Sequence, residues 1–347
     1  MMATNPFAPP PSGAVAVGMG RLTLDVIVRE GMPPRSQGGG TCGNVLTNLA
    51  YLGWRSLPLT NLGDDDSGAR YAADLVRWGV GLDLVRFVPG EETPIIVHHV
   101  REGFAGATHS YSSHCPVCGY RLRYFEPVPL AEVEARLPLV PTPRVFFFDR
   151  DSPGSLRLAG YAKERGALVV YEPNYAGPET SFAEACAVAD VLKFSQERLP
   201  DLSPAPGPSL VIETLGVSGL RYRRGTDWHH LPAFRVTTTR DAGGSGDWCT
   251  AGLIHRVGQQ GVESFRESPT EDIREALRFG QAMSAWNCAF VGARGGVYAV
   301  EKERFRRDVL RILAGEMFDP ADGTPADPLD DAGEYCPSCR AKEPRIV

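Results

Sequence analysis

The sequence predicts an α/β fold with a mostly parallel sheet covered by helices on both faces, plus a second, smaller β-sheet. Short, nearly continuous apolar runs alternate with helix-length stretches along most of the 347 residues. This pattern is typical of a parallel sheet buried on both faces. Two β-rich segments, about 21–37 and 93–126, interrupt the alternation. We expect them to form a small sheet, or lid, over the strands' carboxyl ends, where such sheets bind ligands.

The expected elements follow in chain order. Five apolar runs are predicted to be buried strands of the main sheet: 14–17, 145–148, 168–171, 188–192 and 210–212. The stretches 155–165 and 181–187 are predicted to be helices that connect them. Within the lid, residues 94–100 and 120–125 are rich in strand-forming side chains. A hairpin is expected between residues 221 and 234.

Composition and charge predict a soluble protein with a disordered lead-in and a tail. Residues 1–13 are rich in proline and small side chains, residues 14–315 form the α/β domain, and residues 316–347 begin with an Asp-, Pro- and Gly-rich linker. The chain is 43% apolar with a net charge of −6, which disfavours nucleic acid as the main partner. No apolar run is long enough to cross a membrane, and no signal peptide is recognisable. These features favour the cytoplasm.

The most informative segment is Asp241-Ala-Gly-Gly-Ser-Gly-Asp247, which leads directly into an apolar helix. Glycines allow the backbone to turn tightly beside a ligand, and the first N–H groups of a helix bind anions such as phosphate. A carboxylate at the end of this loop is poorly placed to bind the anion but well placed to deprotonate an attacking hydroxyl. The structural alternative is that Asp247 caps the helix. The loop therefore predicts phosphoryl transfer.

Three segments together resemble the signatures of the ribokinase/PfkB-like carbohydrate and nucleoside kinase family. They are residues 241–247, residues 39–44 (GGTCGN) with a following Leu52-Gly53, and residues 214–220 (TLGVSGL). Ala242 and Ser245 stand where the family has threonine and alanine. The resemblance covers residues 14–313 and implies a ribokinase-like three-layer sandwich. It further implies an ATP- and magnesium-dependent transfer to a sugar or nucleoside hydroxyl, and a lid that often carries a homodimer contact.

This resemblance assigns candidate roles. Asp247 is expected to be the general base, and the backbone of Gly244, Ser245 and Gly246 is expected to hold the developing charge on the phosphoryl group. Four residues are expected to line the acceptor pocket: Asp25, Gly39, Gly40 and Asn44. The expected nucleotide-binding residues are Lys193, Ser195, Glu197, Thr214, Gly216, Gly219, Asn287 and Gly292.

One segment departs from the family pattern. The stretch that organises magnesium and phosphates usually reads N-x-x-E or S-x-x-E, but here Ser195 is followed by Arg198 in the glutamate position. Glu197 would have to act through water from one position earlier, or the metal site is weakened; a solvated helix start is the structural alternative. Glu172, in an E-P-N turn that resembles the family's D-P-N, is a second carboxylate for this site.

Four of the eight cysteines form two matching pairs, Cys115-Pro-Val-Cys118 and Cys336-Pro-Ser-Cys339. Two C-x-x-C pairs supply the four thiolates of a tetrahedral zinc site, which would hold the tail against the lid. The site would lie within one chain or between two chains. Redox pairs and disulfides are the alternatives, and both are uncommon in this context.

Three functions remain open from the sequence. The first is a sugar kinase, with a fructokinase-like acceptor favoured over a nucleoside. The second is a catalytically weakened relative that binds a sugar or nucleotide and regulates another process, a reading kept open by Arg198. The third is a zinc-organised interaction module on a kinase fold. An intact Asp247 loop favours the first.

Overall fold

The computed structural model describes residues 5–101, 108–175, 177–320 and 329–341. Within these residues the main sheet has eight strands in the order β14-β13-β12-β11-β10-β9-β1-β4. The six strands from β4 to β12 run parallel, and β13 and β14 are antiparallel additions at one edge. Their bounds are β1 Val15–Met19, β4 Arg55–Pro58, β9 Val145–Phe148, β10 Leu168–Tyr171, β11 Val191–Ser195, β12 Leu210–Thr214, β13 Leu220–Arg223 and β14 Trp228–Leu231.

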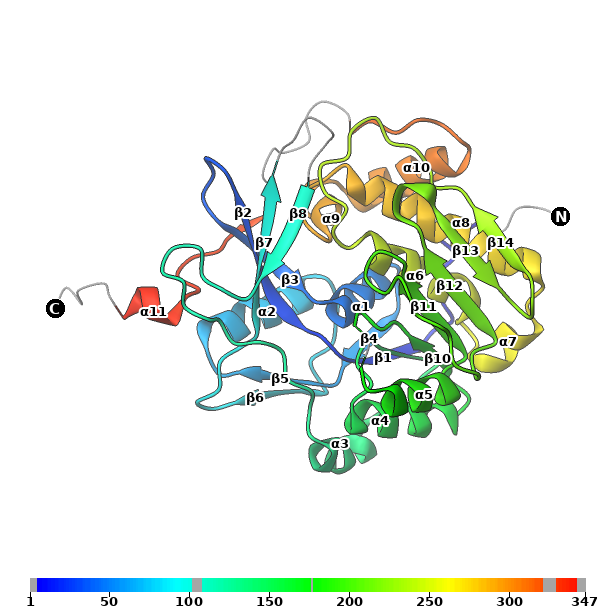
Figure 1. Cartoon of the computed structure of the whole chain (residues 1–347), viewed down its shortest axis with the longest axis horizontal. Coiled ribbons are helices and arrows are strands. Elements are labelled where there is room, and N and C mark those ends of the chain that lie inside the picture. The colour runs from blue at the N-terminus through cyan, green and yellow to red at the C-terminus, as the bar shows by residue number, and fades with distance from the viewer. Residues whose placement is uncertain (1–4, 102–107, 176, 321–328, 342–347) are drawn as a thin grey trace.

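Helices cover both faces of this sheet, which gives three layers (Figure 1). Side chains alternate between faces because successive residues of a strand point in opposite directions. Phe146 and Phe148 therefore join one core, whereas Val145 and Phe147 join the other. The first core is closed by α3 Leu130–Arg136, α4 Pro153–Lys163 and α5 Glu179–Val188, and the second by α1 Thr41–Tyr51, α6 Ser245–Val257, α8 Thr270–Cys288 and α10 Lys302–Leu313.

A second sheet has the order β15-β3-β2-β7-β8, as the sequence predicts for the lid. Its strands are β2 Thr23–Arg29, β3 Arg35–Gly39, β7 Ile95–Arg101, β8 Thr108–Ser112 and the two-residue β15 Asp330–Asp331. In Figure 1 it stands beside the main sheet, with α2 Asp66–Arg77 against it. A separate pair, β5 Thr60–Gly63 and β6 Val85–Val88, lies nearby. The α/β architecture and the smaller sheet are confirmed.

Several local predictions need correction. The strand predicted for 188–192 begins only at Val191, because α5 continues to Val188 and residues 189–190 connect the two elements. In this connection the Asp190 carboxylate accepts the Val169 N–H at 3.1 Å. Residues 120–125 contain only an isolated bridge, between Arg121 and His114. They still border the lid, since the Arg123 carbonyl accepts the Ile95 N–H at 3.1 Å.

The N-terminal segment is ordered from residue 5, unlike the expectation for residues 1–13. Phe7 is 6% exposed, and its ring lies 5.0 Å from the ring of Phe279 and 5.5 Å from that of Phe305, both edge-on. The apolar ring anchors the segment to α8 and α10 despite its prolines. Residues 1–4 lie outside the described part of the chain.

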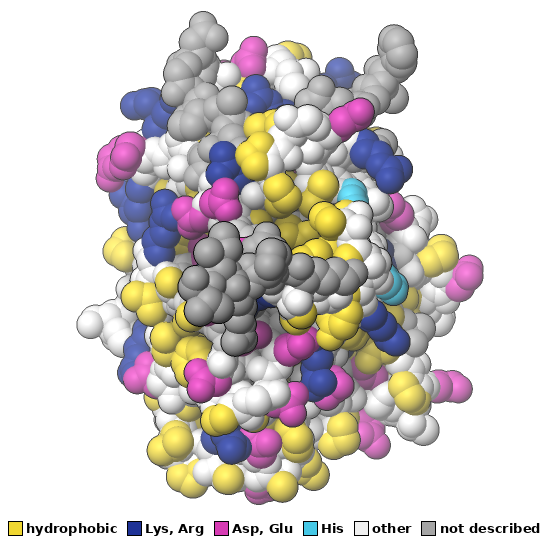
Figure 2. Space-filling view, turned by 90° about the vertical axis from the view of Figure 1, so that its left-hand side faces the viewer, with side chains coloured by type: hydrophobic (Ala, Val, Ile, Leu, Met, Phe, Trp, Pro, Cys, Tyr) yellow, Lys and Arg dark blue, Asp and Glu magenta, His cyan; other side chains and the backbone are white. Residues whose placement is uncertain are grey.

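The C-terminal tail returns to the lid. β15 pairs antiparallel with β3, joining Asp330 to Ser36 and Asp331 to Arg35, and α11 Pro337–Arg340 follows (Figure 1). The middle of the predicted linker, residues 321–328, and residues 342–347 are outside the described ranges. Figure 2 shows this end of the molecule, where basic and acidic side chains are interspersed around apolar ones. None of the described helices is long and apolar enough to span a membrane.

Candidate active site

The loop that precedes α6 is held in shape by its first carboxylate. Asp241 accepts the N–H of Gly243 at 2.8 Å and the N–H of Gly292 at 2.9 Å. Gly244 is the N-cap, with φ 73°, and a β-carbon on it would lie 2.3 Å from the Ala293 carbonyl oxygen. Only glycine tolerates both conditions. The loop therefore presents the start of α6 as a closely packed but partly exposed backbone turn.

The N–H groups at the start of α6 have the orientation that binds anions. Gly244, Ser245 and Gly246 are half-buried, unlike the buried residues that directly follow them in α6. The Ser245 N–H donates to the Ala242 carbonyl at 3.2 Å. Of the three predicted groups, Ser245 is thus engaged within the loop in this conformation.

Asp247 is not the helix cap. The cap is Gly244, which makes no side-chain capping bond, and Asp247 is the third residue of α6. Its carboxylate instead accepts a 2.7 Å hydrogen bond from Nδ2 of Asn44, and only 8% of the residue is exposed. Burial and the nearby Glu172 carboxylate raise the pKa of Asp247 to about 8, against the lowering effect of the Asn44 hydrogen bond and of Lys193. Such a pKa suits a general base near neutral pH.

A buried ion pair lies directly beneath the loop. Lys193 on β11 pairs with Glu172, which follows β10, and the second Glu172 oxygen accepts the Thr250 hydroxyl of α6 at 2.5 Å. A β-carbon on Gly246 would lie 3.3 Å from Lys193 Nζ and 3.5 Å from Glu172 Oε1. The parallel strands therefore bring one cation and one carboxylate next to the backbone at the start of α6.

The predicted acceptor residues meet at the junction of the lid and α1. Asp25 on β2 is almost fully buried and accepts the Thr23 hydroxyl at 2.8 Å. Burial raises the pKa of Asp25 to about 6. A β-carbon on Gly39 would lie 2.1 Å from the Asp25 carboxyl carbon, and one on Gly40 would lie 2.3 Å from the Arg21 carbonyl oxygen. Glycine at both positions is what allows β3 to approach β2 this closely.

Besides Lys193 and Glu197, the predicted nucleotide-binding residues fall into two groups. Ser195 and Thr214 are register partners at the ends of β11 and β12. The turn that follows has Gly216 at φ 57° and Gly219 at φ 96°, and a β-carbon on Gly219 would meet the Leu231 carbonyl oxygen at 2.1 Å. These four residues share one end of the sheet.

Asn287 and Gly292 form the second group, beside the loop of residues 241–247. Asn287 is fully buried, and its Nδ2 donates to the Gly292 and Ala293 carbonyls at 3.2 and 3.1 Å, while its Oδ1 accepts the Gly296 N–H at 3.2 Å. The amide of Asn287 is thus used to shape the loop that packs on Gly244. Its role in nucleotide binding stays a prediction.

The segment that departs from the family pattern is open to solvent. Glu197 and Arg198 are both exposed, whereas Glu172 is the buried carboxylate next to Gly246. The Arg198 charge nonetheless acts on Asp247, whose pKa it helps to lower. Glu172 is therefore the carboxylate that lies beside Gly246, and the Arg198 charge acts on Asp247 from the exposed segment.

The four cysteines of the two C-x-x-C pairs converge within one chain. Their sulfur atoms all lie within 4.8 Å of one another, with Cys115 and Cys339 3.8 Å apart and Cys118 and Cys336 3.6 Å apart. A disulfide needs about 2.05 Å, and all eight cysteines are free. Four thiolates around a zinc ion at about 2.3 Å would be roughly 3.8 Å apart by tetrahedral geometry. The cluster thus has the donor set and spacing of a zinc centre.

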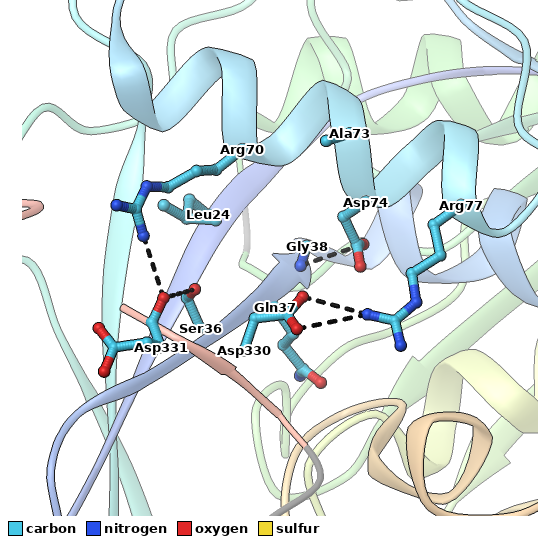
Figure 3. A pocket seen from close by; sticks show the side chains of 10 residues that line it. All are labelled: Leu24, Ser36, Gln37, Gly38, Arg70, Ala73, Asp74, Arg77, Asp330 and Asp331. Carbon is cyan, nitrogen blue, oxygen red and sulfur yellow. Dashed lines mark hydrogen bonds and ion pairs between the residues drawn. The ribbon is translucent and has the colours of Figure 1, made fainter. Parts of the chain in front are cut away.

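The tail also closes a cavity of about 190 Å³ between α2, β3 and β15 (Figure 3). Arg77 pairs with the Asp330 carboxylate at 3.2 Å, and Arg70 donates to the Asp331 carbonyl at 3.0 Å. The Ser36 hydroxyl donates to the same carbonyl at 3.3 Å. The charged lining groups thus join α2 to the tail.

Sequence reasoning missed several residues that hold this site together. Arg294 is fully buried and contacts Asn44, but it follows no recognised pattern. Asp149 is also fully buried and accepts the N–H groups of Arg21 and Cys42 at 2.8 and 3.2 Å. Its position directly after an apolar strand was the available signal, because parallel strands place ligands and polar residues at that end.

Comparison with known proteins agrees with this geometry. Residues 157–298 match the model of the pfkB family of carbohydrate kinases. The fructokinase of Solanum tuberosum is 27% identical over 278 residues, which cover 74% of this chain and 81% of that protein. Among solved structures, fructokinase with bound ATP from Xylella fastidiosa has a TM-score of 0.66 at 18% identity and covers 86% of this chain and 98% of its own. Aminoimidazole riboside kinase from Salmonella enterica has a TM-score of 0.64 at 18% identity, covering 85% and 99%. The chain therefore has a ribokinase-like fold, and residues 157–298 within it are similar to the pfkB family carbohydrate kinases.

Proposed function

We propose that this chain is an ATP-dependent sugar kinase that transfers the γ-phosphoryl group of ATP to a primary hydroxyl of a small sugar. The observation that carries the proposal is the 2.7 Å hydrogen bond between Asn44 and Asp247. It joins an acceptor-pocket residue to a buried carboxylate at the start of α6. The resemblance to fructokinases supports a sugar acceptor.

The chemistry follows from the charges around the loop. Asp247, when ionised, takes the proton of the acceptor hydroxyl as its oxygen attacks the γ-phosphorus, and the bond to the ADP oxygen breaks. The N–H groups of Gly244 and Gly246 stabilise the negative charge on the transferred group, each worth about 3 kcal/mol by analogy with other enzymes. Lys193, 3.3 Å from a β-carbon position on Gly246, adds positive charge beneath it.

Magnesium fits the donors present, although indirectly. Mg²⁺ is usually held by one or two carboxylates together with substrate phosphates and water. Both Glu172 oxygens are engaged, by Lys193 and Thr250, and Glu197 is exposed. We propose that Glu172 and Glu197 would hold the ion together with the ATP phosphates. Magnesium would neutralise charge on those phosphates.

On the nucleotide side, we propose that the turn from Thr214 to Gly219 and the end of β11 at Ser195 line the ATP site. Gly216 and Gly219 have positive φ, so the turn brings backbone close to a ligand without a side chain in between. On the acceptor side, Asp25 would grip hydroxyls over the Gly39-Gly40 backbone. A nucleoside is the alternative acceptor, supported by the structural likeness to aminoimidazole riboside kinase.

The test is ADP release from ATP and magnesium over ketoses, aldoses, sugar acids and nucleosides. We expect one acceptor class to support turnover, and Asp247→Asn to abolish it while ATP binding by calorimetry persists. Asp308→Asn is the matched control, because Asp308 is a buried carboxylate on α10 outside the site. If no acceptor exceeds the Asp247→Asn background while ATP still binds, a regulatory sugar- or nucleotide-binding protein becomes the better explanation.

We further propose that Cys115, Cys118, Cys336 and Cys339 bind one structural zinc ion within a single chain. The sulfur separations of 3.6 and 3.8 Å support this proposal. Each short separation joins a cysteine of the lid to a cysteine of the tail, so both C-x-x-C pairs contribute to one cluster. The expected result is one zinc per chain by elemental analysis of the purified protein. Cys336→Ser should lose it, whereas Cys288→Ser, at the end of α8, should keep it.

Assembly and location are also proposals. β15 occupies the β3 edge of the lid sheet, so a homodimer through the lid would have to use the β8 edge or the sheet's face. Light scattering of the full chain would show whether it dimerises. We place the protein in the cytoplasm, where reducing conditions keep zinc-binding thiols from forming disulfides. A partner lost on zinc removal, with activity intact, would instead favour the interaction-module role.

A further inference from the structure

Arg294 connects three parts of the molecule that are far apart in the sequence. It directly precedes α9 Gly295–Ala299 and is fully buried. Its Nε donates to Asn44 Oδ1 at 3.1 Å, and its Nη2 donates to Asp74 Oδ2 at 2.7 Å and to the Gly38 carbonyl. One guanidinium thus joins the start of α1, helix α2 and lid strand β3.

The Asn44 side chain links Arg294 to the proposed catalytic base, Asp247. Asn44 accepts from Arg294 through Oδ1 and donates to Asp247 Oδ2 through Nδ2 at 2.7 Å. A carboxamide has one acceptor oxygen and one donor NH₂ group, so the bond at Oδ1 fixes which group faces the carboxylate. In the flipped orientation Oδ1 would face Asp247, and two acceptor oxygens would repel each other.

We propose that Arg294 is a positioning residue that acts through Asn44 to keep a hydrogen-bond donor on the catalytic base Asp247. The inference rests on the proposed kinase function. It assigns Arg294 no contact with substrate, and it extends the site to a residue that lies 250 positions from Asn44.

The guanidinium acts through this bond and not through its charge. Asp74 neutralises it, and Asp74 is itself held by the Gly38 N–H and Trp78 Nε1, each at 3.2 Å, and by the Tyr298 hydroxyl. The other ionisable groups around Arg294 are Tyr71 and Asp25. The ionisable groups around Asp247 are Glu172, Lys193, Arg198, Cys42 and Tyr111. Each of these groups remains in place when only the Arg294–Asn44 bond is removed.

Arg294→Lys separates the positive charge of this residue from its hydrogen bond to Asn44. Lysine keeps a positive charge opposite Asp74 but lacks the forked guanidinium that reaches Asn44 and Asp74 together. We expect the rising limb of the pH profile of kcat/KM to move up by about one pH unit, because a carboxylate that loses a hydrogen-bond donor holds its proton more tightly. Asn44→Ala should move it in the same direction, and the double variant should move it no further than Asn44→Ala alone. Arg304→Lys, in an ion pair with Asp308 on α10, is the matched control and should leave the limb in place.

A second readout does not need turnover. Titration of ¹³C-labelled aspartate carboxyls by NMR, with the Asp247 signal assigned by its absence in Asp247→Asn, reports the same shift in the pKa directly. A wild type without kinase activity would overturn the proposed function and leave this titration to decide the role of Arg294. The inference is wrong if folded Arg294→Lys titrates like the wild type, or if its shift adds fully to that of Asn44→Ala. Arg294→Gln, which also removes the guanidinium, replaces it if the lysine variant does not fold.

Discussion

Asn44 and Asp247 are 203 residues apart in the chain, yet their side chains meet in a 2.7 Å hydrogen bond. One lies on α1 below the lid and the other in the first turn of α6. The bond places a donor from the acceptor pocket on the proposed base. It also means that the base is oriented before any substrate is present.

Activity is expected to rise with pH through the pKa of Asp247. The base works only when ionised, and burial together with Glu172 raises its pKa to about 8. The profile of kcat/KM should therefore increase between about pH 7 and 9, since this parameter reports the free enzyme. A rising limb centred near 4, the range of an ordinary aspartate, would contradict Asp247 as the buried base.

Asp247→Asn is expected to stabilise the fold while it lowers kcat by about 10²–10⁴-fold. The folded-state pKa of Asp247 is raised from 3.8 to about 8. Between these values the unfolded chain releases the proton while the folded chain keeps it, so wild-type stability falls across this window and levels off above it. The difference in Tm between variant and wild type should therefore widen from pH 4 to pH 8, by about 1–2 °C per kcal/mol for a chain of this length. A constant difference across that range would show that Asp247 is not a buried, protonated acid.

Asp25→Asn is expected to raise the KM for the acceptor and to leave the KM for ATP unchanged. Burial raises the pKa of Asp25 to about 6, so in the wild type the acceptor KM should also rise as pH falls below that value. The variant should lose this dependence, because its amide does not titrate. Equal effects on both substrates would instead indicate a general structural role for Asp25.

Gly244→Ala should destabilise the protein and remove activity. The residue has φ 73°, and a β-carbon would lie 2.3 Å from the Ala293 carbonyl oxygen. The left-handed conformation alone costs about 1–2 kcal/mol, and the clash adds to it. Gly160→Ala is the matched control: Gly160 lies within α4 with open space around it, so alanine should stabilise by about 0.5–1 kcal/mol. The free energy of unfolding in urea would measure both, and equal values would refute the role of Gly244.

Removal of the proposed zinc ion is expected to lower the Tm. The four cysteines join the lid to the tail, and structural zinc sites contribute directly to folding free energy. Chelation or Cys339→Ser should also release β15 from β3, which amide hydrogen exchange at residues 35–39 would detect. Cys288→Ser is the control for loss of a thiol. An unchanged Tm after verified zinc loss would mean that the β15 pairing holds the tail without metal.

The sequence alone determined the elements with strong local signals. The apolar runs at Val145 and Leu168 could only be buried strands, and the glycine-rich loop before Asp247 required a tight turn at a helix start. The two C-x-x-C pairs indicated a shared site because each supplies half of a tetrahedral donor set. The pattern could not reveal that residues 120–125 stay outside the sheet, or that Phe7 anchors the N-terminal segment, since both depend on what they pack against.

Only the tertiary structure decided which side chains meet. Arg294 belongs to no recognisable motif in the sequence, but the fold buries it completely between Asn44 and Asp74. Water cannot replace its hydrogen bonds there, so the loss of one leaves a buried polar group without a partner. Likewise Glu172, and not Glu197, lies beside the glycine-rich loop at the start of α6, because the register of parallel strands brings the end of β10 next to Lys193. Local sequence fixes periodicity and backbone conformation, whereas contacts across hundreds of residues depend on how the layers stack.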